Sequence, residues 1–187
     1  MPNIEIKAAY PDHDRAKKIL MSLNAKHVGT DHQIDTYFFS PQGRLKLRES
    51  SLSGAQLIPY MRPDQQGPKK SDYLVIPIVD PEACKRLFTQ ILGQDVVVDK
   101  IRDIYLIDNV RVHLDQVKGL GLFFEFEAVY QNAHDEPTEY HKVRELIGIF
   151  GIREQDLING SYRELVKGTS KNHVRYEKLQ SESKQGR

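Results

Sequence analysis

The sequence predicts an α+β fold in which helices pack on the outside of a closed, eight-stranded antiparallel β-barrel with a charged lumen. First, about eight segments alternate apolar and polar residues, as half-buried strands do. Second, most connections between these segments have the length of hairpin loops, which favours antiparallel pairing. Third, three or four segments repeat apolar residues at helical spacing, and their apolar stripes can cover one face of the sheet.

The composition is that of one domain without an overall charge bias. The 187 residues include 27 Lys plus Arg and 26 Asp plus Glu, a net charge of +1 that excludes a global basic field for polyanions. Cys84 is the only cysteine and suits a reducing compartment. The sequence has no apolar run of about 18 residues and no signal-peptide pattern. We therefore expect a soluble, cytoplasmic protein that binds neither nucleic acid nor a membrane, and a homodimer stays open.

The N-terminal third predicts a strand, a helix and two more strands. Apolar and polar residues alternate over residues 4–8, which marks the first strand. Asp12 is placed to cap a helix of about three turns. Residues 33–39 are rich in β-formers and residues 44–49 alternate, so both segments predict strands with a Pro- and Gly-containing turn between them.

The middle of the chain predicts two strands and a second helix. Residues 55–62 form a strand that Pro59 makes irregular or confines to an edge, because proline cannot donate to a ladder. A further strand over residues 71–78 follows a polar loop. Asp80 then acts as the N-cap of a helix that ends at Gly93.

The last third predicts a long strand, a hairpin and two helices. Residues 96–107 are strongly β-forming, and residues 110–127 alternate on both arms of a hairpin with a Gly-Leu-Gly turn. A helix ending at Gly151 follows, and a capping-box pattern at Ser161–Glu164 begins a short final helix. The inward positions of the helix before Gly151 are expected to be Tyr140, Val143, Leu146, Ile147 and Phe150. We place the domain at 1–168 and expect the polar segment 169–187 to be disordered.

The polar faces of the predicted strands carry charged residues. Uncharged polar residues such as Ser, Thr or Gln would be sufficient for a face that is only exposed to solvent. If the apolar faces pack against the helices, the charged residues line one interior: Glu5, Lys7, Lys46, Arg48, Arg62, Lys100, Arg102, Arg111, Asp115, Glu125 and Glu127. Burying so many charges is costly unless they pair or bind a ligand. The cations are suited to phosphate oxygens, and the carboxylates to Mg²⁺ or Mn²⁺. The alternative is a solvated sheet whose charges form cross-strand pairs.

Short motifs follow one another in a fixed order along residues 1–167. They are Asn3–Lys7, Asp35–Phe38, Lys46–Glu49, Tyr60–Asp64, Lys100–Arg102 with Tyr105, Asp115 ahead of Gly119–Gly121, Glu125–Glu127 and Ser161–Arg163. In this order they resemble the CYTH domain family, also called triphosphate tunnel metalloenzymes. The branch described as class IV adenylyl cyclase-like, or CyaB-like, is the most similar.

The resemblance implies a triphosphate bound in the barrel tunnel with Mg²⁺ or Mn²⁺ as cofactor. The implied metal ligands are Glu5, Asp115, Glu125 and Glu127. The implied substrate-binding residues are Lys7, Lys46, Arg48, Arg62, Lys100, Arg102, Arg111 and Arg163. The implied catalytic residues are Lys7, Glu5 and Glu127. Asn3 departs from the family pattern, because an amide stands where the family has a first glutamate; whether one or two metal ions bind therefore stays open.

The same resemblance implies an enzyme, and three functions stay open. We expect a metal-dependent phosphohydrolase that acts on a triphosphate-containing small molecule such as tripolyphosphate, thiamine triphosphate or a nucleoside triphosphate. The first alternative is an adenylyl cyclase that converts ATP to cyclic AMP and pyrophosphate, with Tyr37, Tyr60, Tyr73 and Tyr105 as candidate stacking partners for adenine. The second is a non-catalytic polyphosphate or nucleotide binder. His113 is the one histidine expected in the lumen, with a structural hydrogen bond or proton transfer as its role.

Overall fold

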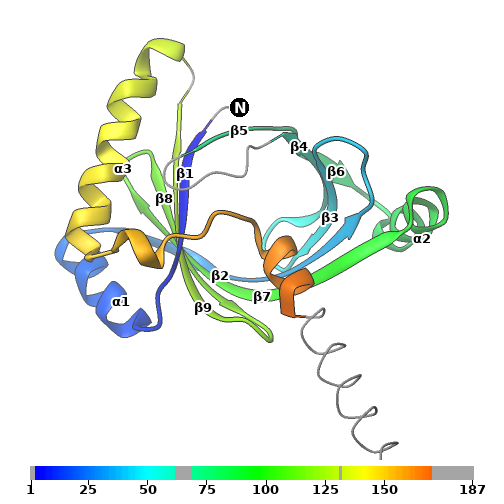
Figure 1. Cartoon of the computed structure of the whole chain (residues 1–187), viewed down its shortest axis with the longest axis horizontal. Helices are drawn as coiled ribbons and strands as arrows, with labels where there is room; N and C mark the ends of the chain where they lie inside the picture. The colour runs from blue at the N-terminus through cyan, green and yellow to red at the C-terminus, as the bar shows by residue number, and fades with distance from the viewer. Residues whose placement is uncertain (1–2, 62–68, 131, 170–187) are drawn as a thin grey trace, which may run out of the picture.

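The protein is built around one antiparallel sheet that closes on itself (Figure 1). The computed structural model describes residues 3–61, 69–130 and 132–169. The strands are β1 (Asn3–Ala9), β2 (Lys26–Phe38), β3 (Arg44–Ser50), β4 (Gly54–Met61), β5 (Lys69–Tyr73), β6 (Ile76–Ile78), β7 (Gln94–Ile107), β8 (Val110–Val117) and β9 (Gly121–Val129). Their order is β3-β2-β7-β8-β9-β1-β5-β4, and β4 pairs with β3 to close the ring. The predicted eight-stranded antiparallel barrel is confirmed.

Two short strands share one position in this ring. β6 pairs with residues 55–57 of β4, whereas β5 pairs with Tyr60 and Met61 further along the same strand. Pro59 lies between the two paired stretches, and its carbonyl accepts a hydrogen bond of 3.1 Å from the amide of Leu74. The irregular strand expected at Pro59 is confirmed, and the single strand expected at 71–78 is wrong because it is broken in two.

The helices are α1 (His13–Ser22), α2 (Pro81–Leu92), α3 (Glu136–Phe150) and a final helix over residues 162–169. Side chains cap the first two as predicted: Asp12 accepts from the amide of Arg15 and Asp80 from that of Ala83, both at 2.9 Å. Gly151 ends α3 in the left-handed conformation, with φ of 65°. Among the residues described, no helix combines the length and apolar character needed to cross a membrane.

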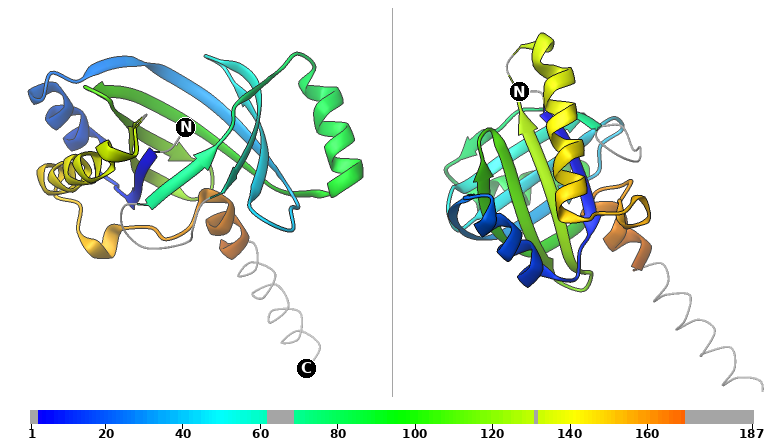
Figure 2. Two further views of the ribbon diagram at one scale, coloured as in Figure 1. Left: turned by 90° about the horizontal axis from the view of Figure 1, so that it is seen from above. Right: turned by 90° about the vertical axis from the view of Figure 1, so that its left-hand side faces the viewer.

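The main hydrophobic core lies outside the barrel, between its wall and the helices α1 and α3 (Figures 1 and 2). Residues at even positions of β1, β8 and β9 point into this core, and they include Ile6, Val112 and Phe126. Because side chains alternate along a strand, the odd positions of the same strands face the lumen. Covering the apolar face with helices therefore forces the polar face inward.

Three features of the helices and strands differ from the sequence predictions. Tyr140 is 38% exposed, so its inward assignment is wrong; the buried residue beside it is Glu139, which accepts from Asn109 at 2.6 Å and Lys142 at 2.8 Å. Helix α2 has no fully buried residue, and it projects from the end of the barrel opposite α1 and α3. β2 begins at Lys26 because it pairs with the long strand β7, although residues 26–32 lack a strand pattern.

The expected boundary of the domain is only partly visible. Thr169 is the last described residue and is helical, so the expectation of disorder does not hold at this position. The rest of the predicted tail, residues 170–187, lies outside the described residues.

The aromatic cluster beneath α3 should dominate the stability of the core. Phe124 is fully buried, and its ring contacts those of Tyr10, Phe126 and Phe150 at centroid distances of 4.6–5.4 Å. We predict that Phe124→Ala lowers the free energy of unfolding by about 3–5 kcal/mol. The matched control Phe39→Ala, at a position 51% exposed, should lower it by less than about 1 kcal/mol. Urea denaturation measures both, and equal losses would contradict this placement of the core.

Candidate active site

The register of the strands brings charged residues together along the lumen. Across β1 and β9, Glu5 lies opposite Glu127 and Lys7 opposite Glu125. Across β9 and β8, Glu125 lies opposite His113. Directly opposed side chains in an antiparallel pair have Cβ atoms about 5 Å apart. Two carboxylates thus face each other in one cross-strand pair, an arrangement that favours a bound cation.

The ring continues through β7, β2 and β3 with mostly cationic residues. Arg102 of β7 lies opposite Asp115 of β8 on one side and Asp31 of β2 on the other. Asp35 of β2 in turn lies opposite Arg48 of β3. Acidic and basic side chains therefore alternate from strand to strand around one continuous wall.

The lumen contains a cavity of about 540 Å³. The cations that line it are Lys7, Lys46, Arg48, Lys100, Arg102 and Arg111. The carboxylates that line it are Glu5, Asp31, Asp35, Glu125 and Glu127. The remaining sequence-predicted residues are Arg62, Asp115 and Arg163: Arg62 lies outside the described residues, and the other two do not line the cavity.

One group of ions is built around the buried carboxylate of Asp35. This carboxylate accepts from Arg48 at 2.7 and 2.8 Å and from Lys46 at 2.9 Å, and Lys100 lies 3.7 Å away. Burial opposes ionisation of Asp35, but Arg48 and Lys46 outweigh it and hold its pKa well below the usual range. Asp35 was not among the site residues predicted from the sequence. The strand pattern could have identified it, because residues two apart on a strand share a face. Asp35 is two residues from Gln33 and from Tyr37, and all three line the cavity.

Burial disfavours the charged form of the two lysines in this group, Lys46 and Lys100. Burial together with the neighbouring Arg48 lowers the pKa of Lys46 to about 8. Burial and the nearby Arg102 lower the pKa of Lys100 well below its ordinary value. Both ammonium groups are therefore poised to gain from an added anion in the cavity.

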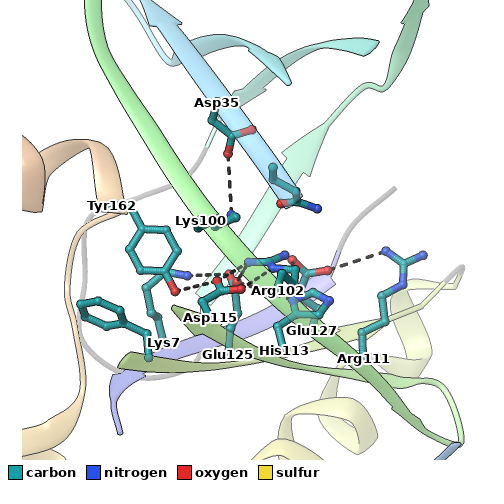
Figure 3. A network of polar contacts seen from close by, with 12 residues as sticks. Lys7, Asp35, Lys100, Arg102, Arg111, His113, Asp115, Glu125, Glu127 and Tyr162 are labelled. Atoms are coloured by element: carbon teal, nitrogen blue, oxygen red, sulfur yellow. Dashed lines mark hydrogen bonds and ion pairs between the residues drawn. The ribbon is translucent and has the colours of Figure 1, made fainter. Parts of the chain in front are cut away.

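A second group of ions is centred on Arg102 (Figure 3). Its guanidinium donates two bonds of 2.6 Å to Asp115 and a third of 2.6 Å to Glu125. Glu125 also pairs with Lys7 at 2.8 Å. Burial raises the pKa of Glu125, but Lys7 and Arg102 outweigh it and keep that pKa well below the ordinary value. The result is a rigid, charge-compensated floor for the cavity.

Tyr162, at the start of the final helix, contacts the Arg102 group and helps to hold it in place. Its hydroxyl donates to Asp115 at 2.7 Å, and its ring centroid lies 4.1 Å from the Lys7 ammonium and 5.2 Å from that of Lys100. Such cation–π contacts stabilise buried ammonium groups without neutralising them. Tyr162 was not assigned to the site from sequence, because its distance from the strands in the chain hides this contact.

Two predicted site residues are placed away from the lumen surface. Asp115 is completely buried, and its oxygens already bind Arg102 and Tyr162. Arg163 is directed to Asp95 at the start of β7, with an Nε–Oδ2 distance of 2.5 Å. Arg111 does line the cavity, near its mouth: its side chain is 43% exposed and lies 3.7 Å from Glu127.

A group of donor atoms beside the floor fits a divalent metal ion. Ligand atoms of His113, Glu125 and Glu127 all lie within 4.8 Å of one another. The Nδ1 atom of His113 is buried and has no hydrogen-bond partner, so a role as a structural donor or acceptor through this atom is not observed. Two carboxylates and an unpartnered imidazole nitrogen are a suitable donor set for a divalent cation.

Tyrosine side chains account for part of the remaining lining. Tyr37, Tyr60 and Tyr73 line the cavity, and the hydroxyls of Tyr37 and Tyr60 lie 3.4 Å apart. Tyr105 instead packs against the outer hydrophobic core, and its ring lies 4.7 Å from that of His27 in a tilted arrangement. It is therefore not placed to contact a ligand in the lumen.

The fold is a closed barrel whose lumen holds paired charges. Comparison with known proteins shows the family to which this barrel belongs. The CYTH domain matches residues 1–162, and the chain belongs to the CYTH domain family.

Individual relatives are distant but cover nearly the whole domain. A Methanocaldococcus jannaschii protein, named as a candidate adenylate cyclase, is 25% identical over 88% of this chain and 98% of its own length. The adenylate cyclase CyaB of Aeromonas hydrophila is 26% identical over 87% of each chain. The structure of the PH1012 protein of Pyrococcus horikoshii superposes with a TM-score of 0.74 and 27% identity, and covers 87% of this chain and 98% of that one.

Removing the buried carboxylate at Asp35 should destabilise the protein strongly in the absence of a ligand. We predict that Asp35→Asn lowers the free energy of unfolding by about 3–5 kcal/mol, because it leaves buried cations without their partner. Tripolyphosphate should recover part of this loss, since it binds only the folded state. The control Asp99→Asn, at a carboxylate that is one-third exposed, should cost less than about 1 kcal/mol. Equal losses in both variants, or no recovery with the anion, would contradict the role of Asp35.

The lowered pKa of Lys46 should appear in the pH dependence of anion binding. Lys46 is charged below a pH of about 8 and loses its charge above it, so affinity for tripolyphosphate should be full below that pH and fall above it. The fall should approach about tenfold per pH unit. Lys46→Arg retains its charge throughout and should shift the fall to higher pH. Calorimetric titration in metal-free buffer at constant ionic strength measures both proteins, and identical profiles would argue against Lys46.

Proposed function

We propose that this protein is a metal-dependent hydrolase of a triphosphate-containing small molecule, which binds in the barrel lumen. The observation that carries the proposal is one cavity in which a set of buried cations faces a metal-binding set of side chains. A polyanion would satisfy the cations, and a divalent ion would satisfy the carboxylates. Hydrolysis needs only these two groups and water, all within the lumen.

The cations of both groups would hold the triphosphate chain. Lys46, Arg48 and Lys100 surround Asp35, and Lys7 and Arg102 pair with Glu125; all five line the same cavity. Arg102 is held by two bonds to Asp115, so its remaining N–H groups are presented in a fixed direction. Phosphoryl transfer depends mainly on positioning and on electrostatic stabilisation, which such pre-placed cations provide.

The metal-binding residues would be His113, Glu125 and Glu127, with Glu5 facing Glu127 across the strands. When bound, Mg²⁺ or Mn²⁺ stabilises the charge that develops on the phosphoryl oxygens. Glu5 or Glu127 would accept the proton of the attacking water, and Lys7 would neutralise a phosphoryl oxygen. We assign Asp115 to positioning Arg102, and Arg163 to fixing the final helix on β7.

Adenylyl cyclase activity is the second candidate. The names of the Methanocaldococcus and Aeromonas relatives favour it, and so do Tyr37 and Tyr60, which lie close to Lys46 and offer aromatic surfaces for a base. Cyclisation uses the same phosphate clamp but requires a pocket for the base and ribose as well. We place hydrolysis first because it requires only the phosphate-binding and metal-binding residues, and no pocket for a base and ribose.

A panel of triphosphates separates the two activities and also a purely binding role. Tripolyphosphate, thiamine triphosphate, ATP and GTP are each incubated with Mg²⁺, Mn²⁺ or EDTA, and phosphate, pyrophosphate and cyclic AMP are measured. Release of phosphate that depends on the metal supports hydrolysis, and cyclic AMP with pyrophosphate supports the cyclase. Tight binding with no product under any condition would overturn both enzyme assignments.

Glu127→Gln tests the metal-binding side of the cavity within the same panel. This carboxylate is more exposed than Glu125, so its replacement should disturb the fold less. We predict a fall in kcat of about 10²-fold or more, because a negative charge is lost where a cation must bind. The control Glu145→Gln lies on the exposed face of α3 and should leave kcat unchanged. An unaltered kcat in Glu127→Gln would remove Glu127 from the active site.

A further inference from the structure

Among the described residues, three side chains that line the cavity have a buried polar atom without a hydrogen-bond partner: those of Asn3, Gln33 and His113. The imidazole of His113 is the one that lies beside two carboxylates. It is 4% exposed, and its Nδ1 atom has no hydrogen-bond partner. Glu125 is the nearer of the two carboxylates beside it, but its Oε2 atom lies 3.6 Å away, beyond hydrogen-bonding distance. Buried polar atoms are nearly always satisfied in native proteins, so this nitrogen indicates a ligand.

The surrounding atoms identify that ligand as a cation. Nδ1 of His113 lies 3.6 Å from Oε2 of Glu125 and 4.0 Å from Oε1 of Glu127. Adjacent ligand atoms on one six-coordinate ion are about 3 Å apart. Small rotations of these side chains would therefore bring all three ligand atoms onto a common ion.

The two carboxylates differ in their freedom to bind this ion. Glu125 already accepts from Lys7 and Arg102, although each carboxylate oxygen has a second lone pair. Glu127 is 18% exposed, and among the described side chains it forms an ion pair with Arg111 at 3.7 Å, whose own side chain is 43% exposed. Glu127 and His113 can thus bind an ion without breaking the Arg102 group.

A neutral residue at Asn3 makes the nitrogen ligand more important. Asn3 lies on the lumen side of β1, two residues from Glu5, and it is buried. An amide contributes no negative charge to an ion in this region. The donor set of this chain is consequently less anionic, and it contains a nitrogen.

We propose that His113 is a direct ligand of the divalent ion together with Glu125 and Glu127, and that it makes the site select first-row transition ions such as Mn²⁺ over Mg²⁺. The inference rests on the proposed function, because it identifies the ion that would serve the same cavity. Mg²⁺ strongly prefers oxygen ligands, whereas an imidazole nitrogen adds to the affinity of transition ions. The choice of ion would then follow from a single side chain of β8.

The test is pulsed electron paramagnetic resonance of Mn²⁺ bound to the full chain without substrate. Spin-echo modulation should show coupling of Mn²⁺ to a ¹⁴N nucleus, and labelling with ¹⁵N-histidine should change its frequencies. His113 is the only histidine that lines the cavity among the residues described, so the isotope effect identifies it. This measurement requires no substitution and no turnover.

Binding titrations with Mn²⁺ and Mg²⁺ then measure selectivity. His113→Gln should abolish the nitrogen coupling and weaken Mn²⁺ binding by about tenfold or more, with a change below about threefold for Mg²⁺. His141→Gln, at a histidine that is 74% exposed on α3, is the matched control and should alter neither. Circular dichroism of each variant checks that the fold is retained.

The possible results separate this inference from the proposed function. Bound Mn²⁺ without nitrogen coupling, or equal losses for both ions in His113→Gln, would overturn the inference, even if triphosphate hydrolysis depends on metal. Nitrogen coupling from His113 together with no product from any triphosphate would support the ion site and overturn the proposed function.

Discussion

The requirement that buried charges be paired governs this structure. The barrel directs its apolar faces outward to α1 and α3, so the polar faces of its strands enclose the lumen. Isolated ions there would be very costly, and each cation in the two described groups lies against a carboxylate or an aromatic ring. Asp35 and Arg102 are the centres of these groups. Fold stability and the chemistry of the lumen therefore depend on the same side chains.

This pairing also prepares the cavity for its ligand. Three cations share the single carboxylate of Asp35, which leaves that group with positive charge. Burial first, and then the neighbouring Arg48 and Arg102, lower the pKa values of Lys46 and Lys100, so both ammonium groups are held in a site that disfavours positive charge. A phosphate chain would relieve this excess of positive charge. On the other side, His113, Glu125 and Glu127 offer donors to a cation, so a metal–triphosphate complex matches both halves of the cavity.

Rigid support distinguishes the two halves. Arg102 is held by Asp115 and Glu125, and Tyr162 locks Asp115 from the final helix. This support keeps a guanidinium in one orientation, as phosphate recognition requires. The side chain of Arg111 is 43% exposed and lies 3.7 Å from Glu127, so it is held less tightly than that of Arg102. The cavity thus combines one fixed guanidinium with a more exposed one.

The alternation of residues in the sequence determined which side chains face the lumen. A strand has a period of two, so Glu5 and Lys7, or Lys100 and Arg102, must share a face. It also indicated that helices cover the apolar face of the sheet, whereas the closure of that sheet into a barrel was implied by the resemblance to the CYTH domain family. The irregularity at Pro59 could be predicted because it follows from local chemistry.

Only the tertiary structure decided how the charges are distributed among partners. Cross-strand register placed Asp35 among three cations at the cavity surface, whereas Asp115 is fully buried beneath Arg102 and Tyr162. Packing of the final helix places Arg163 against Asp95 and lets the hydroxyl of Tyr162 donate to Asp115. The unpartnered nitrogen of His113 likewise depends on distances to β9 that no local pattern encodes. Local periodicity sets the direction of a side chain, whereas its partners are set by contacts between residues far apart in the chain.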